Sequence, residues 1–337
     1  MQRREFLHPN QLAQTAGQVL ATLNGAAPPS EPALTLLRFG RRAMATSFEI
    51  ALPLGTCDAH AAAADGLELI DRLEAQMTVY REDSDVSRIN CHAADGAMPV
   101  ESRLFELFQL AERIHTETEG VYDIAVGALI KTWGFFRRQG RVPADTERAA
   151  ALARSGMRHL LLDPNRMIRF ATGGVEINLG SIGKGYALDR VVQRLQAEWH
   201  IGAGLVHGGT SSVAGFGRSW TVGLGHPSNL KRRLGVVRLR DRALGTSSAT
   251  FQHLIHEGRK LGHILDPRSG WPAEQLASAT AVAPTAAQAD ALATAFFVLG
   301  EAGTRVYCQK HPEIGAVLLP LGQHAAPLAL GNVEFAS

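Results

Sequence analysis

One acidic residue stands alone in a long apolar stretch near the C-terminus. Between Glu274 and Glu301 the only charged side chain is Asp290, and residues 286–299 around it are strongly apolar. A helix of this composition is expected to be buried. A buried carboxylate requires a cation, strong hydrogen-bond donors or its own proton. Asp290 is therefore the first candidate for chemistry.

The predicted ends of this helix determine which residues share a helix face with Asp290. Thr285 and Gln288 form a Thr-x-x-Gln capping box, and Gly300 supplies a left-handed stop, so we predict a helix between them. Asp290 and Thr294 then lie one turn apart on the same face. Their oxygens suit Mg²⁺, which takes few protein ligands and completes its shell with water and phosphate. The alternative left open is that Thr294 bonds back to the Asp290 carbonyl while Asp290 pairs with an arginine.

A glycine-rich turn is the second candidate. It connects a predicted strand over 175–179 to a predicted helix over 186–199. Such turns offer backbone N–H groups and a positive helix end to phosphate, with Lys184 as a cation and the amides near Gly183 and Gly185 as donors. The turn matches neither the Walker pattern nor GxGxxG, so on spacing alone a structural turn is the simpler interpretation.

The third candidate is the segment Leu-Gly-His-Ile-Leu-Asp-Pro-Arg-Ser-Gly at 261–270. His263 follows a predicted hairpin whose turn is Glu257-Gly258, and a tight loop comes after it. The chain has 13 histidines. Position alone therefore does not separate His263 from the others.

The elements that must position these residues alternate between strands and helices. We predict paired strands over 34–39 and 47–52, and helices over 63–77 and 104–114. A turn-rich stretch is expected over 80–90, and a long strand-rich region over 205–263. The order lacks a strict βαβ rhythm. It indicates an α+β fold in which helices pack on largely antiparallel sheets.

Composition excludes several classes of protein. With 45% hydrophobic and 20% charged residues, the 337-residue chain can bury a large core as one domain or two lobes. A net charge of +2 with scattered basic pairs gives no reason to expect nucleic-acid binding. Cys57, Cys91 and Cys308 lack the spacing of a disulfide framework or zinc site. No apolar run is long enough to predict a membrane span.

We interpret residues 1–33 as a leader and linker, and 34–330 as the functional domain. Arg3-Arg4-Glu5-Phe6-Leu7 is similar to a twin-arginine export signal, but polar residues follow where an apolar segment should begin. The start also has no lipid-anchoring cysteine. An exported, periplasmic location and a cytoplasmic one both stay open.

Read together and in order, the motifs resemble the ApbE family of FAD:protein FMN transferases, once called thiamine biosynthesis lipoproteins. The resemblance runs from about residue 34 to 319 and implies an ApbE-like (T-fold-like) architecture. It rests on residues 44–47, 77–90, 120–127 with 133–135, 178–189, 208–209, 263–270, and Ala289-Asp290 with Thr294.

The resemblance implies an activity. Family members cleave the FAD pyrophosphate with Mg²⁺ and transfer FMN to a threonine hydroxyl of a partner protein, releasing AMP. The acceptor carries an Asp-x-Ser/Thr-Gly-Ala-Thr motif. Two alternatives stay open, namely hydrolysis of FAD to FMN and AMP, and a non-catalytic FAD-binding protein.

The resemblance also implies roles for individual residues. Asp290 and Thr294 match the metal ligands, with Ser181 completing that site, and His263 matches a base for the acceptor hydroxyl. Lys184 is expected to act in catalysis on the second phosphate. The positions that match the FAD cradle are Met44, Tyr80, Val121, Tyr122, Asp123, Asn178, Lys184 and Leu265.

Three positions depart from the family pattern. Ala45 stands where glycine is usual, Asn178 where an acid is common, and Thr210 where aspartate normally follows two glycines. Asn178 can still hydrogen-bond a nucleotide but cannot act as a carboxylate.

Overall fold

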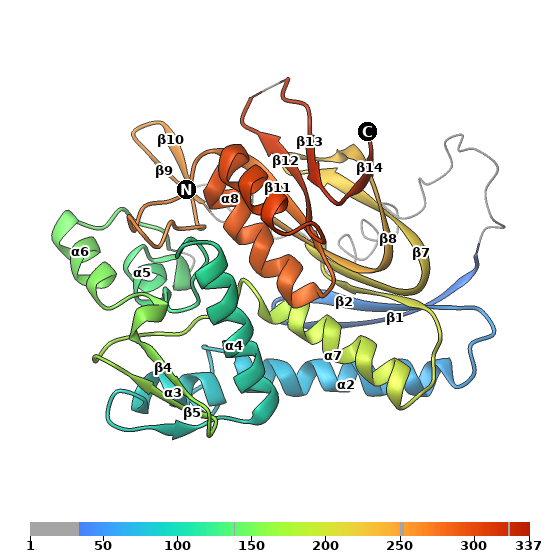
Figure 1. The fold of residues 1–337 in the computed structure, drawn as a ribbon, viewed down its shortest axis with the longest axis horizontal. Coiled ribbons are helices and arrows are strands. Elements are labelled where there is room, and N and C mark those ends of the chain that lie inside the picture. The colour runs from blue at the N-terminus through green and yellow to red at the C-terminus, as the bar shows by residue number, and fades with distance from the viewer. Residues whose placement is uncertain (1–33, 138, 250–252, 323) are drawn as a thin grey trace, which may run out of the picture.

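The computed structural model describes residues 34–137, 139–249, 253–322 and 324–337. The predicted leader, 1–33, lies outside the described residues. One large sheet carries helices on one face, and a group of shorter elements lies beside it (Figure 1). The strands and helices confirm the predicted α+β class.

The large sheet has nine strands in the order β1-β2-β6-β7-β8-β11-β12-β13, with β14 paired to β8. Every neighbouring pair is antiparallel. The strands are β1 Leu36–Ala43, β2 Thr46–Pro53, β6 Gly204–Gly208, β7 Ser212–His226, β8 Asn229–Ser248, β11 Leu276–Ala283, β12 Gly315–Pro320, β13 Leu328–Gly331 and β14 Glu334–Ala336. The fold thus continues past residue 330, because β14 extends the sheet.

Three helices cover one face of this sheet: α2 (Ala59–Met77), α7 (Gly183–Ala197) and α8 (Ala286–Lys310). The two-residue alternation of a strand places Phe48, Ile50 and Leu52 of β2 in the core beneath the helices. Ala51 joins a second core on the other face of the sheet, together with Trp220.

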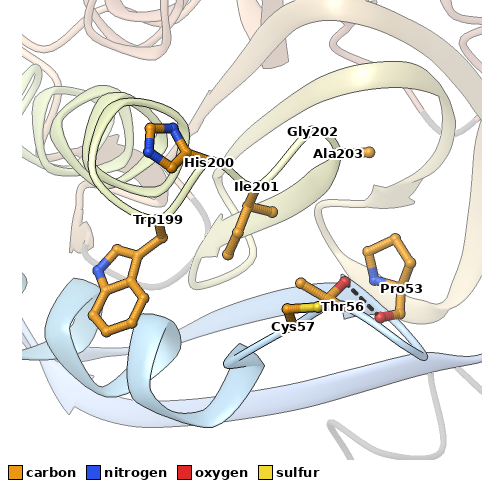
Figure 2. Close-up of a pocket in the computed structure, with 8 residues that line it drawn as sticks. All are labelled: Pro53, Thr56, Cys57, Trp199, His200, Ile201, Gly202 and Ala203. Atoms are coloured by element: carbon orange, nitrogen blue, oxygen red, sulfur yellow. Dashed lines mark hydrogen bonds between the residues drawn. The ribbon is translucent and has the colours of Figure 1, made fainter.

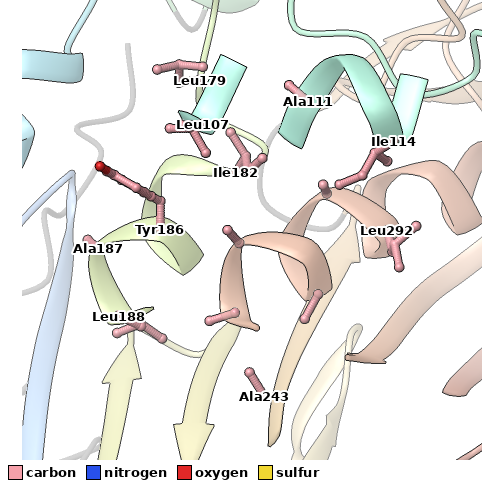
Figure 3. Packing of buried hydrophobic residues seen from close by; sticks show 14 of the residues in the cluster. Leu107, Ala111, Ile114, Leu179, Ile182, Tyr186, Ala187, Leu188, Ala243 and Leu292 are labelled. Carbon is pink, nitrogen blue, oxygen red and sulfur yellow. The ribbon is translucent and has the colours of Figure 1, made fainter. Parts of the chain in front are cut away.

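Among the elements beside the large sheet, α4 (Ser102–Glu117) packs against α8. Figure 3 shows buried side chains of α4, α7 and α8 gathered together, among them Leu107, Leu188 and Leu292. The remaining elements are α3 Asp85–His92, α5 Gly127–Thr132, α6 Asp145–Ala153, the short helices Phe135–Arg137 and Met157–His159, the sheet of β3 Met98–Pro99, β5 Met167–Phe170 and β4 Leu160–Asp163, and the hairpin of β9 His253–His256 and β10 Arg259–Gly262.

Two local predictions are wrong. The turn-rich interpretation of 80–90 missed α3, which begins where the Ser84 hydroxyl accepts a hydrogen bond from the Ser87 N–H. The predicted strand at 175–179 pairs with no strand. The Asn90 side chain instead binds the backbone N–H and carbonyl of Ile177, at 2.7 and 3.0 Å, and takes the place of a strand partner.

Helix α8 begins as predicted. Thr285 caps it by accepting a hydrogen bond from the Gln288 N–H. Gly300 has φ 68° and ψ −166°, which interrupts the helix at the predicted stop, and a further helical segment then continues to Lys310.

Candidate active site

Helices α7 and α8 cross closely at their N-termini. A β-carbon on Gly185 of α7 would lie 2.0 Å from the Ala286 carbonyl oxygen at the start of α8. In β8, a β-carbon on Gly245 would lie 2.6 Å from the backbone of Ala289. Only residues without side chains permit these contacts. The two glycines thereby bring both helix ends and β8 to one place.

Each of these helices supplies a carboxylate that caps the other. Asp189 of α7 accepts hydrogen bonds from the N–H groups of Ala286 and Ala287, at 2.7 and 2.8 Å. Asp290 of α8 accepts one from the N–H of Gly185, at 2.7 Å. Both carboxylates thus satisfy N–H groups that have no partner within their own helix, at the positive end of the helix dipole. Burial raises the pKa of Asp189 to about 7, against the two amide hydrogen bonds that lower it.

Asp290 is buried, as its apolar surroundings predict. The Ser212 hydroxyl donates to Oδ1 at 2.7 Å, while the Gly185 N–H holds Oδ2. Burial raises the pKa of Asp290, and the positive charge of Lys184 is the largest influence that lowers it. The cation acting on Asp290 is therefore this lysine of the glycine-rich turn, where the alternative interpretation expected an arginine.

Thr294 lies one turn beyond Asp290. Its hydroxyl donates to the Asp290 carbonyl oxygen at 3.3 Å, as the alternative interpretation expected, and lies 3.0 Å from the Ser247 hydroxyl of β8. A threonine hydroxyl keeps acceptor lone pairs while it donates to a carbonyl. The back-bond therefore does not prevent Thr294 from binding a cation.

Ser181 is linked to this group through Tyr122. The Ser181 hydroxyl donates to the Tyr122 phenol oxygen at 3.3 Å. Tyr122 is fully buried, and burial raises its pKa, with the charge of Asp290 acting in the same direction. Tyr122 thus connects Ser181 to the electrostatic environment of Asp290.

The candidate ligands offer oxygen alone. They comprise the Asp290 carboxylate and the hydroxyls of Thr294, Ser181 and Ser247, which are the hard ligands that Mg²⁺ prefers. Across the part of the chain that the structure describes, no cluster of three or more His, Cys, Asp or Glu side chains is placed to hold a metal ion. A cation here would have one carboxylate, so this donor set fits a metal whose other ligands come from substrate phosphates and water.

The glycine-rich turn uses its amides internally. The Gly183 N–H donates to the Leu179 carbonyl at 2.7 Å, and the Gly185 N–H is occupied by Asp290. The expectation that amides at these two glycines hold a phosphate is therefore not met in this conformation. The half-buried Lys184 side chain remains the phosphate contact that this segment can offer.

Three residues expected in the FAD cradle lie on turns or at the surface. Met44 and Ala45 form the two-residue turn between β1 and β2, with φ of 48° and 59°, so Ala45 adopts the conformation that a glycine would adopt without strain. Tyr80 is 71% exposed and stacks on Phe136 at 4.8 Å between ring centroids. The Asn178 side-chain oxygen accepts a hydrogen bond from the Gly180 N–H, at 2.9 Å.

The segment Val121-Tyr122-Asp123 is buried. The Asp123 carboxylate accepts hydrogen bonds from the N–H groups of Ala125 and Met157, at 2.7 and 2.8 Å, and lies 3.4 Å from His115 Nδ1. In this structure Asp123 therefore organises the backbone around it. Burial raises its pKa despite these partners.

His263 follows β10 directly and is half-buried. Its ring meets Phe135 edge-on, with 6.4 Å between centroids. Leu265, two residues on, is buried in a cluster with Phe135. The neighbouring Gly262 is so close to Ala249 that a β-carbon would lie 2.3 Å from that side chain. Since Ala249 is two residues beyond Ser247, His263 lies near the end of β8 that contacts Thr294.

The structure thus brings Lys184, Asp290 and Thr294 together, and Ser181 hydrogen-bonds to Tyr122, whose pKa is raised in part by the charge of Asp290. Val121 and Leu265 are buried in apolar clusters, and Asp123 holds backbone amides. Among the residues that the structure describes, no hydrogen bond joins the side chain of Met44 or Tyr80 to Asp290, Thr294 or Ser181. Roles for Ser212 and Asp189 at the site were not predicted from the sequence. Asp189 lies within the motif 178–189, whereas nothing in the local pattern distinguishes Ser212 from other serines.

A separate pocket of about 250 Å³ lies at the other end of α7. Figure 2 shows Trp199 and His200 on one side of it and Thr56 and Cys57 on the other. None of the predicted site residues lines this pocket.

The protein has a largely antiparallel α+β fold, and oxygen atoms line its candidate site where two helices cross. The sequence matches the model of the ApbE family over residues 44–318, and the chain belongs to that family. It is 29% identical over 301 residues to the FAD:protein FMN transferase of Klebsiella pneumoniae, covering 84% of each chain. It is 30% identical over 240 residues to that of Vibrio cholerae, covering 69% of this chain and 72% of the other.

Solved structures show the same fold. The ApbE protein of Thermotoga maritima superposes with a TM-score of 0.80 at 28% identity, covering 88% of this chain and 97% of that one. The flavinyl transferase ApbE of Pseudomonas stutzeri gives a TM-score of 0.78 at 27% identity, covering 88% of this chain and 95% of that one.

Within the described residues, no helix has the length and apolar character to cross a membrane.

Proposed function

We propose that this chain transfers FMN from FAD to a threonine hydroxyl of an acceptor protein in a Mg²⁺-dependent reaction that releases AMP. The relatives named above are FAD:protein FMN transferases, which supports the reaction class. The observation that carries the proposal is the buried Asp290 carboxylate, held by Ser212 and Gly185 beside Lys184 and Thr294.

The metal would be held by Asp290, Thr294 and Ser181. A bound Mg²⁺ supplies charge neutralisation on the pyrophosphate, which otherwise repels an electron-rich hydroxyl. The protein's own part is to keep one ionisable carboxylate buried and oriented. It also keeps the ammonium of Lys184 near the second phosphate.

In the transfer, a bond forms between the acceptor hydroxyl oxygen and the phosphorus of the FMN half. The bond from that phosphorus to the bridging oxygen breaks, and AMP leaves with the electron pair. The hydroxyl proton goes to a base, which we assign to His263, because an imidazole nitrogen can accept a proton and this ring lies near the Thr294 end of the site.

The remaining cradle residues would bind the rest of FAD. Tyr80 presents one face of an exposed aromatic ring, which can stack on a planar flavin or adenine. Met44 lies at the β1–β2 turn, and Asn178 offers an amide group beside the glycine-rich turn. Val121, Tyr122 and Leu265 would shape the apolar wall of the cradle.

Two other outcomes use the same residues. If water replaces the acceptor, the protein hydrolyses FAD to FMN and AMP; without chemistry, it is a FAD-binding protein. The test is to incubate the protein with FAD, Mg²⁺ and a peptide containing Asp-x-Thr-Gly-Ala-Thr, and to measure the intact peptide mass. A gain equal to FMN supports transfer. Free FMN without an adduct supports hydrolysis, and FAD that binds but stays intact supports the binding protein.

A matched peptide sharpens this test. Replacing the acceptor threonine by valine keeps the side-chain shape but removes the hydroxyl, so the proposal expects no adduct on that peptide. An adduct on the valine peptide would place the modification elsewhere and contradict transfer to a threonine oxygen.

A further inference from the structure

Both oxygens of the Asp290 carboxylate are held by the protein. Ser212 Oγ donates to Oδ1 and the Gly185 N–H donates to Oδ2, each at 2.7 Å. A carboxylate offers about four lone-pair positions, so two donors leave others available to a cation. With one donor on each oxygen, the carboxylate cannot rotate about its Cβ–Cγ bond without losing a buried hydrogen bond.

Ser212 is itself rigidly placed. It is completely buried as the first residue of β7, and it pairs with Gly208 in β6 and with Gly245 in β8. Gly245 is also the residue whose backbone meets α8 beside Ala289. The sheet register, and not a loop, therefore delivers the Ser212 hydroxyl to Asp290.

We infer that Ser212 is a positioning residue for the metal-binding carboxylate. The inference rests on the proposed function, in which Asp290 binds Mg²⁺. A carboxylate that is already oriented loses less conformational freedom when it binds a cation. Hydrogen-bond partners of metal ligands typically contribute 10- to 100-fold in metal affinity, so Ser212 should act on the affinity for metal and not on the chemical step.

The neighbouring serine provides a matched control. Ser211 Oγ lies 3.4 Å from Ser212 Oγ and has no hydrogen bond to Asp290 among the contacts of the described residues. Ser211→Ala removes the same hydroxyl one position away. Ser212→Thr keeps the hydroxyl, so it should preserve the bond to Asp290 and restore the function lost in Ser212→Ala.

The experiment measures Mn²⁺ binding by electron paramagnetic resonance in the presence of ADP, which carries adenosine and a pyrophosphate but no flavin. For Ser212→Ala we expect the Kd for Mn²⁺ to rise about 10- to 100-fold. Ser211→Ala and Ser212→Thr should stay close to the parent protein. Thermal unfolding of each variant shows whether it is folded.

A second readout separates affinity from chemistry. In FMN transfer to the peptide, the Mg²⁺ concentration at half-maximal rate should rise by the same factor in Ser212→Ala, while the rate at saturating Mg²⁺ stays near that of the parent. Unchanged Mn²⁺ affinity in Ser212→Ala, with or without lost stability, would overturn the inference. If Asp290→Asn still abolished Mn²⁺ binding in that case, the proposed function would stand. If Asp290→Asn also bound Mn²⁺ normally, both would fall.

Discussion

Asp189 and Asp290 exchange helix caps. Asp189 projects from α7 onto the first amides of α8, and Asp290 projects from α8 onto an amide in the first turn of α7. The carboxylate assigned to the metal is therefore also a structural cap. This arrangement ties the position of the predicted metal ligand to the position of Lys184, which lies in that same turn of α7.

Loss of the Asp189 cap should destabilise the protein. Asp189→Ala leaves the N–H groups of Ala286 and Ala287 without their acceptor, and losing a cap of this kind costs ~0.5–2 kcal/mol. Asp189→Asn keeps one acceptor oxygen, so its stability should lie between those of the parent protein and Asp189→Ala. Urea unfolding measures both; equal stability in all three proteins would show that the cap contributes nothing.

The helix crossing should not tolerate a methyl group at Gly185. Its β-carbon would overlap the Ala286 carbonyl, so we expect Gly185→Ala to reduce the free energy of unfolding by about 1–3 kcal/mol. Gly183→Ala is the control, because its β-carbon would make only ordinary van der Waals contacts, with the Met77 side chain at 3.6 Å and with Leu179 Cβ at 3.9 Å. A similar stability for the two variants, measured by denaturant unfolding, would contradict the close crossing.

His263→Asn should slow transfer without weakening FAD binding. A general base contributes about 10²–10⁴-fold, so the rate of adduct formation on the peptide should fall by that factor. FAD affinity, measured by flavin fluorescence, should change little. His256→Asn, at an exposed position of the β9–β10 hairpin that precedes His263, serves as control. If FAD affinity falls in proportion to the rate, His263 is a binding residue and not the base.

The attachment of α2 to α7 should depend on pH. The hydrogen bond from Arg194, followed by that from Trp199, lowers the pKa of Asp65 below 3.8, although burial opposes this. A lowered folded-state pKa means that the stabilisation is fully present above the unfolded value and is lost as the pH falls through the folded value. We expect Asp65→Asn to cost about 1 kcal/mol at pH 7 and almost nothing in strong acid.

The control for this prediction is Asp71→Asn, which removes a more exposed ion pair with Arg41. Such surface pairs contribute little, so its stability should follow the parent at every pH. If Asp65→Asn shows the same loss of stability at pH 7 and in strong acid, the ionised carboxylate is not its source.

Much of α8 could be predicted from the sequence, but little of what surrounds it could. The Thr285 cap, the Gly300 interruption and the burial of Asp290 were predictable, because each depends on residues within a few turns of chain. The partners of Asp290 were not. Ser212 is 78 residues away along the chain and Gly185 is 105. Only the sheet register and the helix crossing bring them to it.

The two local errors have different origins. Residues 175–179 have the apolar character of a strand, but the Asn90 side chain occupies the backbone groups of Ile177. Helix α3 is eight residues long and polar on most of its surface, so only Val86 and Ile89 mark its buried face. At 175–179 a tertiary contact decides the local structure, and a single sequence contains no direct signal for it. For α3 the Ser84 cap is a local signal, but two buried apolar residues are too few to show a helical period.

In the proposed reaction, the Asp290 carboxylate binds the Mg²⁺ required for transfer. The most direct measurement is FMN transfer to the acceptor peptide by Asp290→Asn, followed by intact mass at increasing Mg²⁺. Asparagine keeps the shape and an oxygen acceptor but loses the negative charge. We expect a folded protein that forms no adduct at Mg²⁺ concentrations saturating for the parent. Adduct formation at the parental rate and with the parental Mg²⁺ dependence would contradict the account.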